Sequence, residues 1–208
     1  MNHSSGEDLL RLTDRFDAAV EYARTVHTGF RKGSKVPYLA HLLGVASLVM
    51  GETGHVPFAV TEDMVIAALL HDAVEDEGGL PRLADIEEKF GKEVAEIVLG
   101  CSDSVATDSD KKEEWAARKA GYIQKLRGES QGTLLVSAAD KLYNARAILE
   151  DYRQVGAEVW KRFQRGRNDQ IGYFEALLKV YEVKCAGWRI IGELKRVVTE
   201  LKRVTEAA

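Results

Sequence analysis

The amino-acid sequence predicts an all-α protein, a single-domain bundle of about ten helices. Three observations support this prediction. Only three prolines interrupt the 208 residues, apolar side chains recur at helical spacings along most of the chain, and few β-branched runs alternate with polar residues. An apolar content of 45% and a charged content of 30% are typical of a globular protein with a buried core.

The order of the elements follows from this periodicity and from local start and stop signals. Thr61 caps an expected helix whose first turn is acidic, and the glycine- and proline-containing run at 78–81 ends it. A basic, glycine-containing loop at 29–37 and a polar loop at 102–112 separate other helices. The expected helices cover residues 8–28, 41–52, 61–76, 82–89, 91–103, 110–127, 132–151, 156–165, 168–184 and 186–206.

The last expected helix, at 186–206, is a C-terminal extension beyond a core of about residues 10–180. Its apolar residues recur at spacings of three and four and so form one stripe. The stripe either packs on the helix's own domain, which is the favoured interpretation, or forms a contact between two copies. We therefore expect a monomer or a weak homodimer. The stripe consists of Trp188, Ile191, Leu194, Val198 and Leu201.

Charge and cysteine content exclude several function classes. Lys and Arg number 29 against 33 Asp and Glu, so a formal net charge of −4 gives no general attraction to nucleic acid or to an anionic membrane. The N-terminus lacks a signal-peptide hydrophobic region, and no apolar run approaches the ~20 residues that span a bilayer. Cys101 and Cys185 form no CxxC pair, and we expect reduced thiols in a cytoplasmic protein.

The stretch at 67–76 carries the strongest functional signal. One histidine and three carboxylates, within six residues, directly follow an apolar run. Unpaired charge in a dry site is costly, and a bound cation compensates for it. His71 and Asp72 are therefore candidate metal ligands. On a continuous helix Glu75 lies near both, and Asp76 lies near Asp72.

Two further positions fit the same cation. His41 begins an apolar helical segment, and Asp140 follows six mostly apolar or small residues in a helix that we expect to be buried. Two imidazoles and two carboxylates leave open positions on an octahedral ion. Such mixed ligation suits Mn²⁺ or Fe²⁺ better than a closed structural Zn²⁺ site. Open positions admit water and substrate, which indicates catalysis.

Each of these residues alone has a simpler explanation. His41 alone is typical of a hydrogen-bonded core or surface histidine, Asp140 alone can pair with Lys141 or Arg146, and the acidic pair alone is an ordinary solvated helix end. The combination and its order along the chain favour a metal site. No role is expected for the remaining histidines, which lie at the surface or pack in the core: His3, His27 and His55.

The order His41, His71-Asp72, Asp140 resembles that of HD-domain metal-dependent phosphohydrolases. The likeness is narrower, because the segment from Ala23 to His41 resembles the start of the RelA/SpoT hydrolase domain. The stretch from His71 to Asp76 matches the HDxxED pattern of that branch, and the stretch at 139–144 matches its AD(K/R)LxN pattern. The likeness covers roughly residues 10–180. Since no synthetase, TGS or ACT-like segment follows within 208 residues, the chain is similar to stand-alone small alarmone hydrolases, which include a metazoan SpoT homologue.

The resemblance implies a Mn²⁺-dependent 3′-pyrophosphohydrolase with one ion per chain. It implies that (p)ppGpp is hydrolysed to GDP or GTP and pyrophosphate, which clears the alarmone of the stringent response. By motif position, His41, His71, Asp72 and Asp140 are the expected metal ligands, and Glu75 and Asp76 the expected catalytic carboxylates. Arg31, Lys32 and Asn144 are expected to contact the nucleotide, and Arg24 and Lys141 to offset its negative charge.

Two alternatives remain open at this stage. The same metal chemistry can act on another phosphorylated nucleotide, such as (p)ppApp or NADPH, because it does not read the base. The second alternative is a non-catalytic alarmone binder, although a binder has little reason to retain all six ligand and carboxylate positions.

A mixed aromatic and basic segment at 160–167 has two interpretations. It is either a helix with a snorkelling basic face or a second phosphate contact through Arg165 and Arg167.

Overall fold

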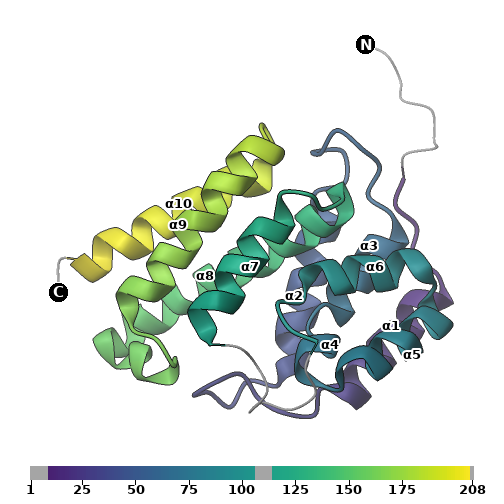
Figure 1. The fold of residues 1–208 in the computed structure, drawn as a ribbon, viewed down its shortest axis with the longest axis horizontal. Coiled ribbons are helices and arrows are strands. Elements are labelled where there is room, and N and C mark those ends of the chain that lie inside the picture. The colour runs from purple at the N-terminus through teal and green to yellow at the C-terminus, as the bar shows by residue number, and fades with distance from the viewer. Residues whose placement is uncertain (1–8, 106–113, 207–208) are drawn as a thin grey trace.

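The computed structural model describes residues 9–105 and 114–206, and within these ranges every regular element is a helix (Figure 1). The all-α prediction is confirmed. The elements are α1 (Asp14–Val26), α2 (Tyr38–Gly51), α3 (Glu62–Leu70), α4 (Ala73–Asp76), α5 (Gly79–Phe90), α6 (Lys92–Cys101), α7 (Trp115–Leu126), α8 (Gln131–Val155), the 3₁₀ helix η2 (Gly156–Arg162), α9 (Arg167–Lys184) and α10 (Arg189–Glu206).

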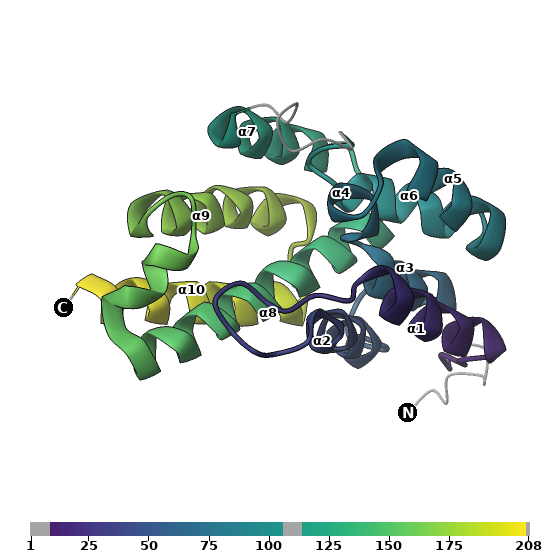
Figure 2. The same ribbon diagram turned by 90° about the horizontal axis from the view of Figure 1, so that it is seen from below.

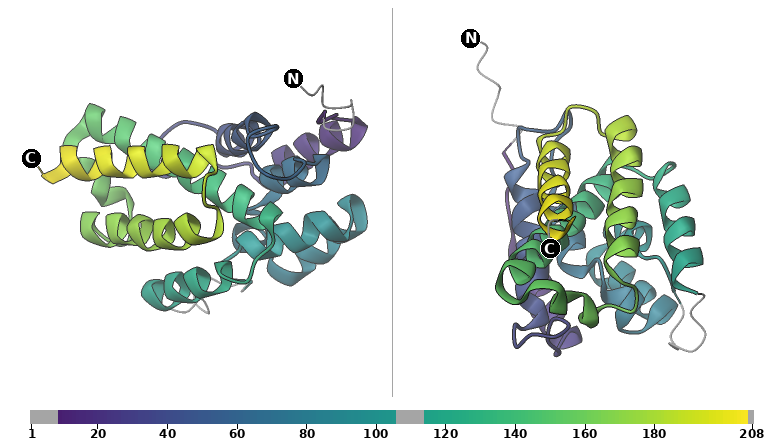
Figure 3. Two further views of the ribbon diagram at one scale, coloured as in Figure 1. Left: turned by 90° about the horizontal axis from the view of Figure 1, so that it is seen from above. Right: turned by 90° about the vertical axis from the view of Figure 1, so that its left-hand side faces the viewer.

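The longest helix, α8, connects the two ends of the molecule (Figure 2). Its N-terminal half packs against α2, α3 and α6, and its C-terminal half packs against α10. Two further views show α9 and α10 on the side of α8 away from α1 and α5 (Figure 3). Because α8 passes through the core, a polar side chain in its middle lies among several other helices.

The core is continuous from α1 to α10. Helix α3 lies at its centre, and its last seven residues, from Met64 to Leu70, are all buried against neighbouring helices. Removing apolar surface from water is the main driving force for this packing. Thr61 begins the helix as expected, because its hydroxyl accepts a hydrogen bond from the Met64 backbone N–H.

The single helix expected at 61–76 is wrong in one respect. Helix α3 ends at Leu70, His71 and Asp72 form a turn, and α4 begins at Ala73. Adjacent residues on a continuous helix point in directions about 100° apart and do not face each other. Both residues keep right-handed φ and ψ angles, and at this interruption of the helix His71 Nε2 lies 3.2 Å from Asp72 Oδ2.

Other boundaries differ by a few residues. Helix α1 begins at Asp14 because the Thr13 side chain caps it. Helix α5 begins at Gly79, which places Pro81 in its first turn, where the missing N–H is tolerated. The helix expected at 156–165 is the 3₁₀ element η2. Four predictions lie wholly or partly outside the described residues: the surface position of His3, residue 8 of the first helix, residues 110–113 of the helix expected at 110–127, and residues 106–112 of the polar loop.

The C-terminal helix α10 packs its apolar stripe on its own chain, mainly against α8 and α9. This is the first of the two interpretations of that stripe. None of the helices described is both long enough and apolar enough to cross a membrane.

Candidate active site

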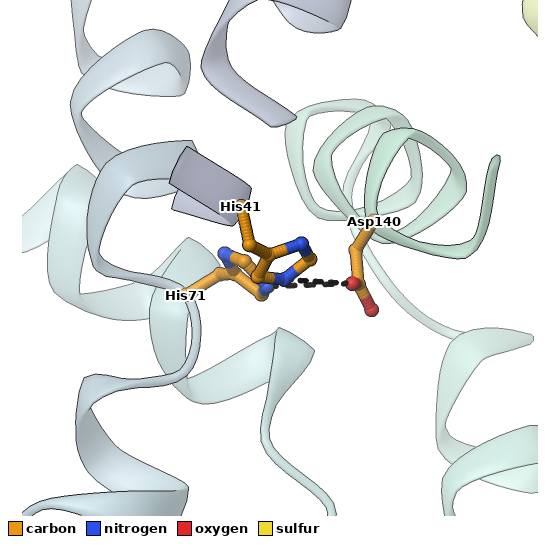
Figure 4. Close-up of side chains that lie close together, drawn as sticks. All are labelled: His41, His71 and Asp140. Atoms are coloured by element: carbon orange, nitrogen blue, oxygen red, sulfur yellow. Dashed lines mark ion pairs between the residues drawn. The ribbon is translucent and has the colours of Figure 1, made fainter. Parts of the chain in front are cut away.

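Four side chains from three parts of the fold converge in the core. His41 lies in the first turn of α2, His71 and Asp72 lie in the turn between α3 and α4, and Asp140 lies in the middle of α8. We call these four residues the His–Asp cluster. Figure 4 shows His41 and His71 side by side, with the Asp140 carboxylate facing their ring nitrogens.

The distances within the His–Asp cluster are short. The His41 Nε2 atom lies 3.4 Å from Asp72 Oδ2 and 3.3 Å from Asp140 Oδ1. The His71 Nε2 atom lies 3.2 Å and 3.5 Å from the same two oxygens. One ligand atom each from His41, His71 and Asp140 lies within 4.8 Å of the others, and this group can hold a metal ion.

The histidines fit a cation better than a hydrogen-bond network. His41 is fully buried and His71 is 2% exposed, yet neither Nε2 atom has a hydrogen-bond partner among the described residues. The His71 Nδ1 atom lies 2.8 Å from the Ala68 carbonyl oxygen. Burial opposes protonation of His71, but the Asp72 and Asp140 carboxylates outweigh it and raise the pKa of the imidazole, so the site attracts positive charge at Nε2. A metal ion would take the place of the Nε2 proton, while Nδ1 donates to the Ala68 carbonyl, the usual arrangement of a metal-ligating histidine.

The carboxylates remain ionised in this environment. Burial opposes ionisation of Asp140, but Lys141 and the two imidazoles outweigh it and hold the pKa of Asp140 well below its usual range. Burial likewise opposes ionisation of Asp72, but the histidines lower the pKa of Asp72 strongly. Two carboxylates, one buried and one partly buried, face the two buried imidazole Nε2 atoms, and this is the donor set expected of a site for a divalent ion.

Aromatic side chains enclose the cluster. The Tyr38 hydroxyl donates a hydrogen bond of 2.5 Å to Asp72 Oδ2, and the Tyr38 ring stacks on the ring of His27 with centroids 5.0 Å apart. His27 is buried, and burial lowers its pKa to about 4, so this ring is neutral and packs in the core as expected. The ring of Tyr143 covers His41 from α8.

Three of the five predicted substrate residues lie beside the cluster, and two of them contact each other. Arg31 donates a 2.5 Å hydrogen bond to Asn144 Oδ1, and its guanidinium lies over the Tyr38 ring. Asn144 in turn donates to Asp140 Oδ1 at 2.5 Å. Lys141 pairs with the other oxygen, Asp140 Oδ2, at 2.5 Å. The sequence predicted these residues from motifs, and the fold connects them in one chain of contacts.

The other two predicted substrate residues lie apart from this chain of contacts. Lys32 is exposed on the turn after Arg31 and makes no hydrogen bond or ion pair with the described residues. Arg24 is 59% exposed on α1, where it pairs with Glu21. Long, exposed cationic side chains such as these can change rotamer at little cost and so can reach a bound nucleotide.

The predicted catalytic carboxylates occupy different environments. Asp76 is exposed at the end of α4, and its Oδ2 atom lies 3.5 Å from the Tyr38 hydroxyl. Glu75 faces the inside of the molecule with 22% of its side chain exposed. Burial, followed by the nearby Asp103 charge, raises the pKa of Glu75 to about 7. A carboxyl group with such a pKa can exchange protons near neutral pH.

Sequence reasoning missed three residues next to Glu75. Asp103 from the segment after α6 and Arg118 and Lys119 from α7 surround its carboxyl group. The sequence shows only that Arg118 and Lys119 are adjacent basic residues. It does not show that they meet Asp103 and Glu75, because these partners lie 15 to 43 residues away in the chain.

A buried tyrosine was also missed. Tyr173 from α9 has a hydroxyl without a hydrogen-bond partner among the described residues, and its ring lies 5.2 Å from Lys119 Nζ. The Tyr173 ring also lies 6.0 Å from the ring of Trp115, so it packs against the first half of α7, where Lys119 lies.

The basic residues of the segment at 160–167 have protein partners. Arg165 pairs with Glu114, and Arg167 donates to the Thr205 hydroxyl and lies near Glu206. These contacts favour a structural interpretation of both side chains over a phosphate contact.

Comparisons with known proteins agree with this geometry. A family model described as an HD domain matches residues 19–171. The chain is 31% identical over 190 residues to the guanosine-3′,5′-bis(diphosphate) 3′-pyrophosphohydrolase MESH1 of Mus musculus, a match that covers 85% of this chain and 96% of that protein. It is 35% identical over 164 residues to MESH1 of Xenopus tropicalis, with 72% and 84% covered.

Two solved structures share the fold. One is of a metazoan orthologue of SpoT that hydrolyses ppGpp; it has a TM-score of 0.70 and 24% identity, and the match covers 91% of this chain and 97% of that one. The other is of a protein from Listeria monocytogenes; it has a TM-score of 0.61 and 29% identity, and the match covers 80% and 99%.

Proposed function

Because the chain belongs to the HD-domain family, we propose that it is a metal-dependent hydrolase that removes the 3′-pyrophosphate of (p)ppGpp. The products are GDP or GTP and pyrophosphate. The relatives named as guanosine-3′,5′-bis(diphosphate) 3′-pyrophosphohydrolases support the substrate. The observation that carries the reaction is the pair of buried imidazoles whose Nε2 atoms have no hydrogen-bond partner among the described residues and face two ionised carboxylates.

We further propose that the His–Asp cluster holds one Mn²⁺ ion. Imidazole and carboxylate donors suit Mn²⁺, and four protein ligands leave positions for water and for a phosphate oxygen. When bound, such an ion lowers the pKa of a water molecule and polarises the phosphorus. The Tyr38 and Ala68 contacts orient Asp72 and His71 for this role.

Glu75 and Asp76 are proposed to handle the protons of the reaction. Water attacks the phosphorus attached to the 3′ oxygen of the nucleotide. The bond between this phosphorus and the 3′ oxygen breaks, and pyrophosphate is released. One carboxylate accepts a proton from the water, and a proton is returned to the 3′ oxygen. The raised pKa of Glu75 supports its capacity to hold and release a proton near neutral pH.

The nucleotide is proposed to lie against Arg31 and Asn144. Their contact chain to Asp140 supports a position next to the metal. Lys141 adds positive charge from the same helix, and Lys32 and Arg24 are the proposed mobile contacts to the nucleotide and its phosphates. These contacts do not distinguish guanine from adenine, so (p)ppApp and NADPH stay as competing substrates.

We also propose that residues 1–208 act as one HD-type unit in the cytoplasm, as a monomer or a weak homodimer. The continuous core from α1 to α10 supports one unit. Cys101 and Cys185 are both free, which is compatible with a reducing compartment. Light scattering after size-exclusion chromatography measures the oligomeric state.

The decisive experiment is turnover by metal-stripped protein with and without Mn²⁺. We expect Mn²⁺-dependent release of GDP and pyrophosphate from ppGpp, with a higher kcat/KM than for ppApp or NADPH. A higher kcat/KM for one of the other two nucleotides reassigns the substrate. Tight Mn²⁺ binding without turnover of any of the three favours the non-catalytic binder.

Substitution of the two carboxylates tests their role. Glu75→Gln and Asp76→Asn are each expected to lower kcat by about 10²- to 10⁴-fold, the usual contribution of a general acid or base. Mn²⁺ content stays at one ion per chain, because neither residue belongs to the His–Asp cluster. Full turnover by a Mn²⁺-loaded variant would contradict the role of that residue.

A further inference from the structure

Asp103 is a buried carboxylate that two cations hold. Its side chain is 3% exposed and lies in the segment that follows α6. Arg118 donates a hydrogen bond to Asp103 Oδ1, and Lys119 Nζ lies 2.5 Å from Asp103 Oδ2. Both cations come from consecutive positions of α7, so this one carboxylate fastens α7 to the segment after α6.

The same group of residues reaches both oxygens of Glu75. The Asp103 backbone N–H donates a 3.3 Å hydrogen bond to Glu75 Oε2. The Arg118 Nη1 atom lies 3.6 Å from Glu75 Oε1. Glu75 itself is part of α4, a helix of only four residues, so contacts from outside α4 are needed to fix its carboxyl group.

Asp103 compensates part of the positive charge that lies beside Glu75. Arg118 and Lys119 supply two positive charges close to Glu75, and Asp103 pairs with both of them. Without the Asp103 charge, Arg118 can shorten its 3.6 Å ion pair with Glu75 and Lys119 can join it, which would hold Glu75 as an anion. The raised pKa of Glu75 agrees with this balance, because burial and the Asp103 charge raise it while Lys119 lowers it.

We propose that Asp103 and Arg118 are positioning residues, whose contacts hold the carboxyl group of Glu75 in one orientation, and that Asp103 engages Arg118 and Lys119 so that the ion pair between Arg118 and Glu75 stays long. Neither residue needs to touch the substrate for this role. The proposal rests on the proposed function for the catalytic role of Glu75. It is independent of which nucleotide is the substrate.

The test variant is Asp103→Asn, which keeps the shape and removes the charge. We expect kcat to fall by about 10- to 100-fold, a part of the contribution of the carboxylate itself, while KM changes by less than about threefold. One limb of the pH–rate profile reports the titration of Glu75 and is absent in Glu75→Gln. In Asp103→Asn this limb moves to lower pH, because the negative charge of Asp103 is gone. The charged groups that set this limb are Asp103, Arg118, Lys119, Asp72 and Asp76.

Arg118 gives a second variant with the opposite sign. Arg118→Met removes a cation next to Glu75, so the same limb moves to higher pH while kcat falls. Arg118→Lys keeps the charge, and we expect it to restore the position of the limb and part of kcat. Asp17→Asn on α1 removes one charge from an exposed site and serves as the matched control, with wild-type kcat and pH profile.

A direct titration separates this proposal from the proposed function. Carbon-13 NMR of the glutamate carboxyl groups, with Glu75→Gln for assignment, gives the pKa of Glu75 without any turnover. We expect this pKa to fall in Asp103→Asn and to be unchanged in Asp17→Asn. If the wild type does not hydrolyse any of the nucleotides, the proposed function fails while the titration still tests the network. If Glu75→Gln loses turnover but Asp103→Asn keeps wild-type kcat and an unchanged Glu75 pKa, the positioning role is wrong.

Discussion

At the scale of single residues, each side chain of the His–Asp cluster is oriented by a neighbour. The Ala68 carbonyl fixes the His71 ring, the Tyr38 hydroxyl binds Asp72, and Lys141 pairs with Asp140. The motifs made the four cluster residues predictable. They did not predict the role of Tyr38, because a tyrosine before a histidine has no distinctive spacing and its partner lies 34 residues away.

Tyr38→Phe tests the contribution of this neighbour. The substitution removes the hydroxyl that donates to Asp72 and leaves the ring on His27 in place. We expect the affinity for Mn²⁺ to fall by about 10- to 100-fold, as is usual when a hydrogen-bond partner of a metal ligand is lost. Isothermal titration with Mn²⁺ measures the change. Tyr152→Phe is the control, because it removes a tyrosine hydroxyl from a different helix, α8. An equal loss of Mn²⁺ affinity in both variants would argue against a specific role for Tyr38.

The raised pKa of Glu75 also has a consequence for stability. Because its pKa is about 7 in the folded protein and 4.5 is the usual value, the folded state holds a proton between these pH values that the unfolded chain releases. The ionised group therefore destabilises the fold progressively as pH rises from about 4.5 to about 7.

Glu75→Gln removes this titration. We compare the unfolding free energy of the metal-free variant with that of metal-free wild type. This difference is expected to change in favour of the variant by about 1–3 kcal/mol when the pH is raised from about 4 to about 8. Denaturant unfolding at the two pH values measures the difference. Glu158→Gln removes the same charge from an exposed position in η2 and serves as the control. A difference that does not change with pH would show that Glu75 is not buried in this way.

At the scale of helices and turns, the site depends on two features of the packing. The turn at His71 and Asp72 brings adjacent residues to one point, and the close contact of α2 with α8 brings His41 to Asp140. Gly44 allows this contact, because a Cβ atom there would collide with the Tyr143 ring of α8. Periodicity predicted helices at both places, but neither the turn nor the close approach has a periodic signal.

Gly44→Ala tests the helix contact. The added methyl group forces the Tyr143 ring to move and separates α2 from α8, so we expect a loss of about 1–3 kcal/mol in stability. Mn²⁺ affinity falls as well, since His41 and Asp140 lie on the two separated helices. Thermal unfolding and Mn²⁺ titration measure both effects. Gly121→Ala on α7 meets open space and is expected to gain up to about 1 kcal/mol; an unaffected Gly44→Ala would contradict the close contact.

A second glycine supports the loop that carries Arg31. Gly33 has a positive φ of 68°, and a Cβ atom there would lie 2.5 Å from Arg162 Cδ. Arg162 is held by Asp151 of α8 at 2.6 Å. The loop therefore rests on η2 and α8, which the basic pattern at 160–167 did not indicate.

At the scale of the whole molecule, the His–Asp cluster joins parts of the chain that are far apart in sequence. Its side chains come from α2, from the turn before α4 and from the middle of α8, the helix that connects the two ends of the fold. A metal ion bound there links these elements in the folded state only. Metal binding is therefore expected to stabilise the entire fold.

This stabilisation can be measured by thermal unfolding. At a free Mn²⁺ concentration of about 100 times Kd, the gain is about 2.7 kcal/mol, which for a chain of this size corresponds to a rise in Tm of about 5–10 °C. Chelation reverses the rise, and Asp140→Asn loses most of it. A rise of equal size in Asp140→Asn and wild type would place the ion at another site.

The sequence by itself determined the helical class, the approximate positions of the helices, the order of the metal-site residues and the family. These properties are local, since helical periodicity, capping and short motifs act over a few neighbouring positions. Only the tertiary structure decided that His71 and Asp72 leave the helix, that Gly44 admits Tyr143, and that Asp103 and Arg118 meet Glu75. Such contacts join residues 28 to 99 positions apart, and their energies depend on burial and on charges that come together only when the chain is folded.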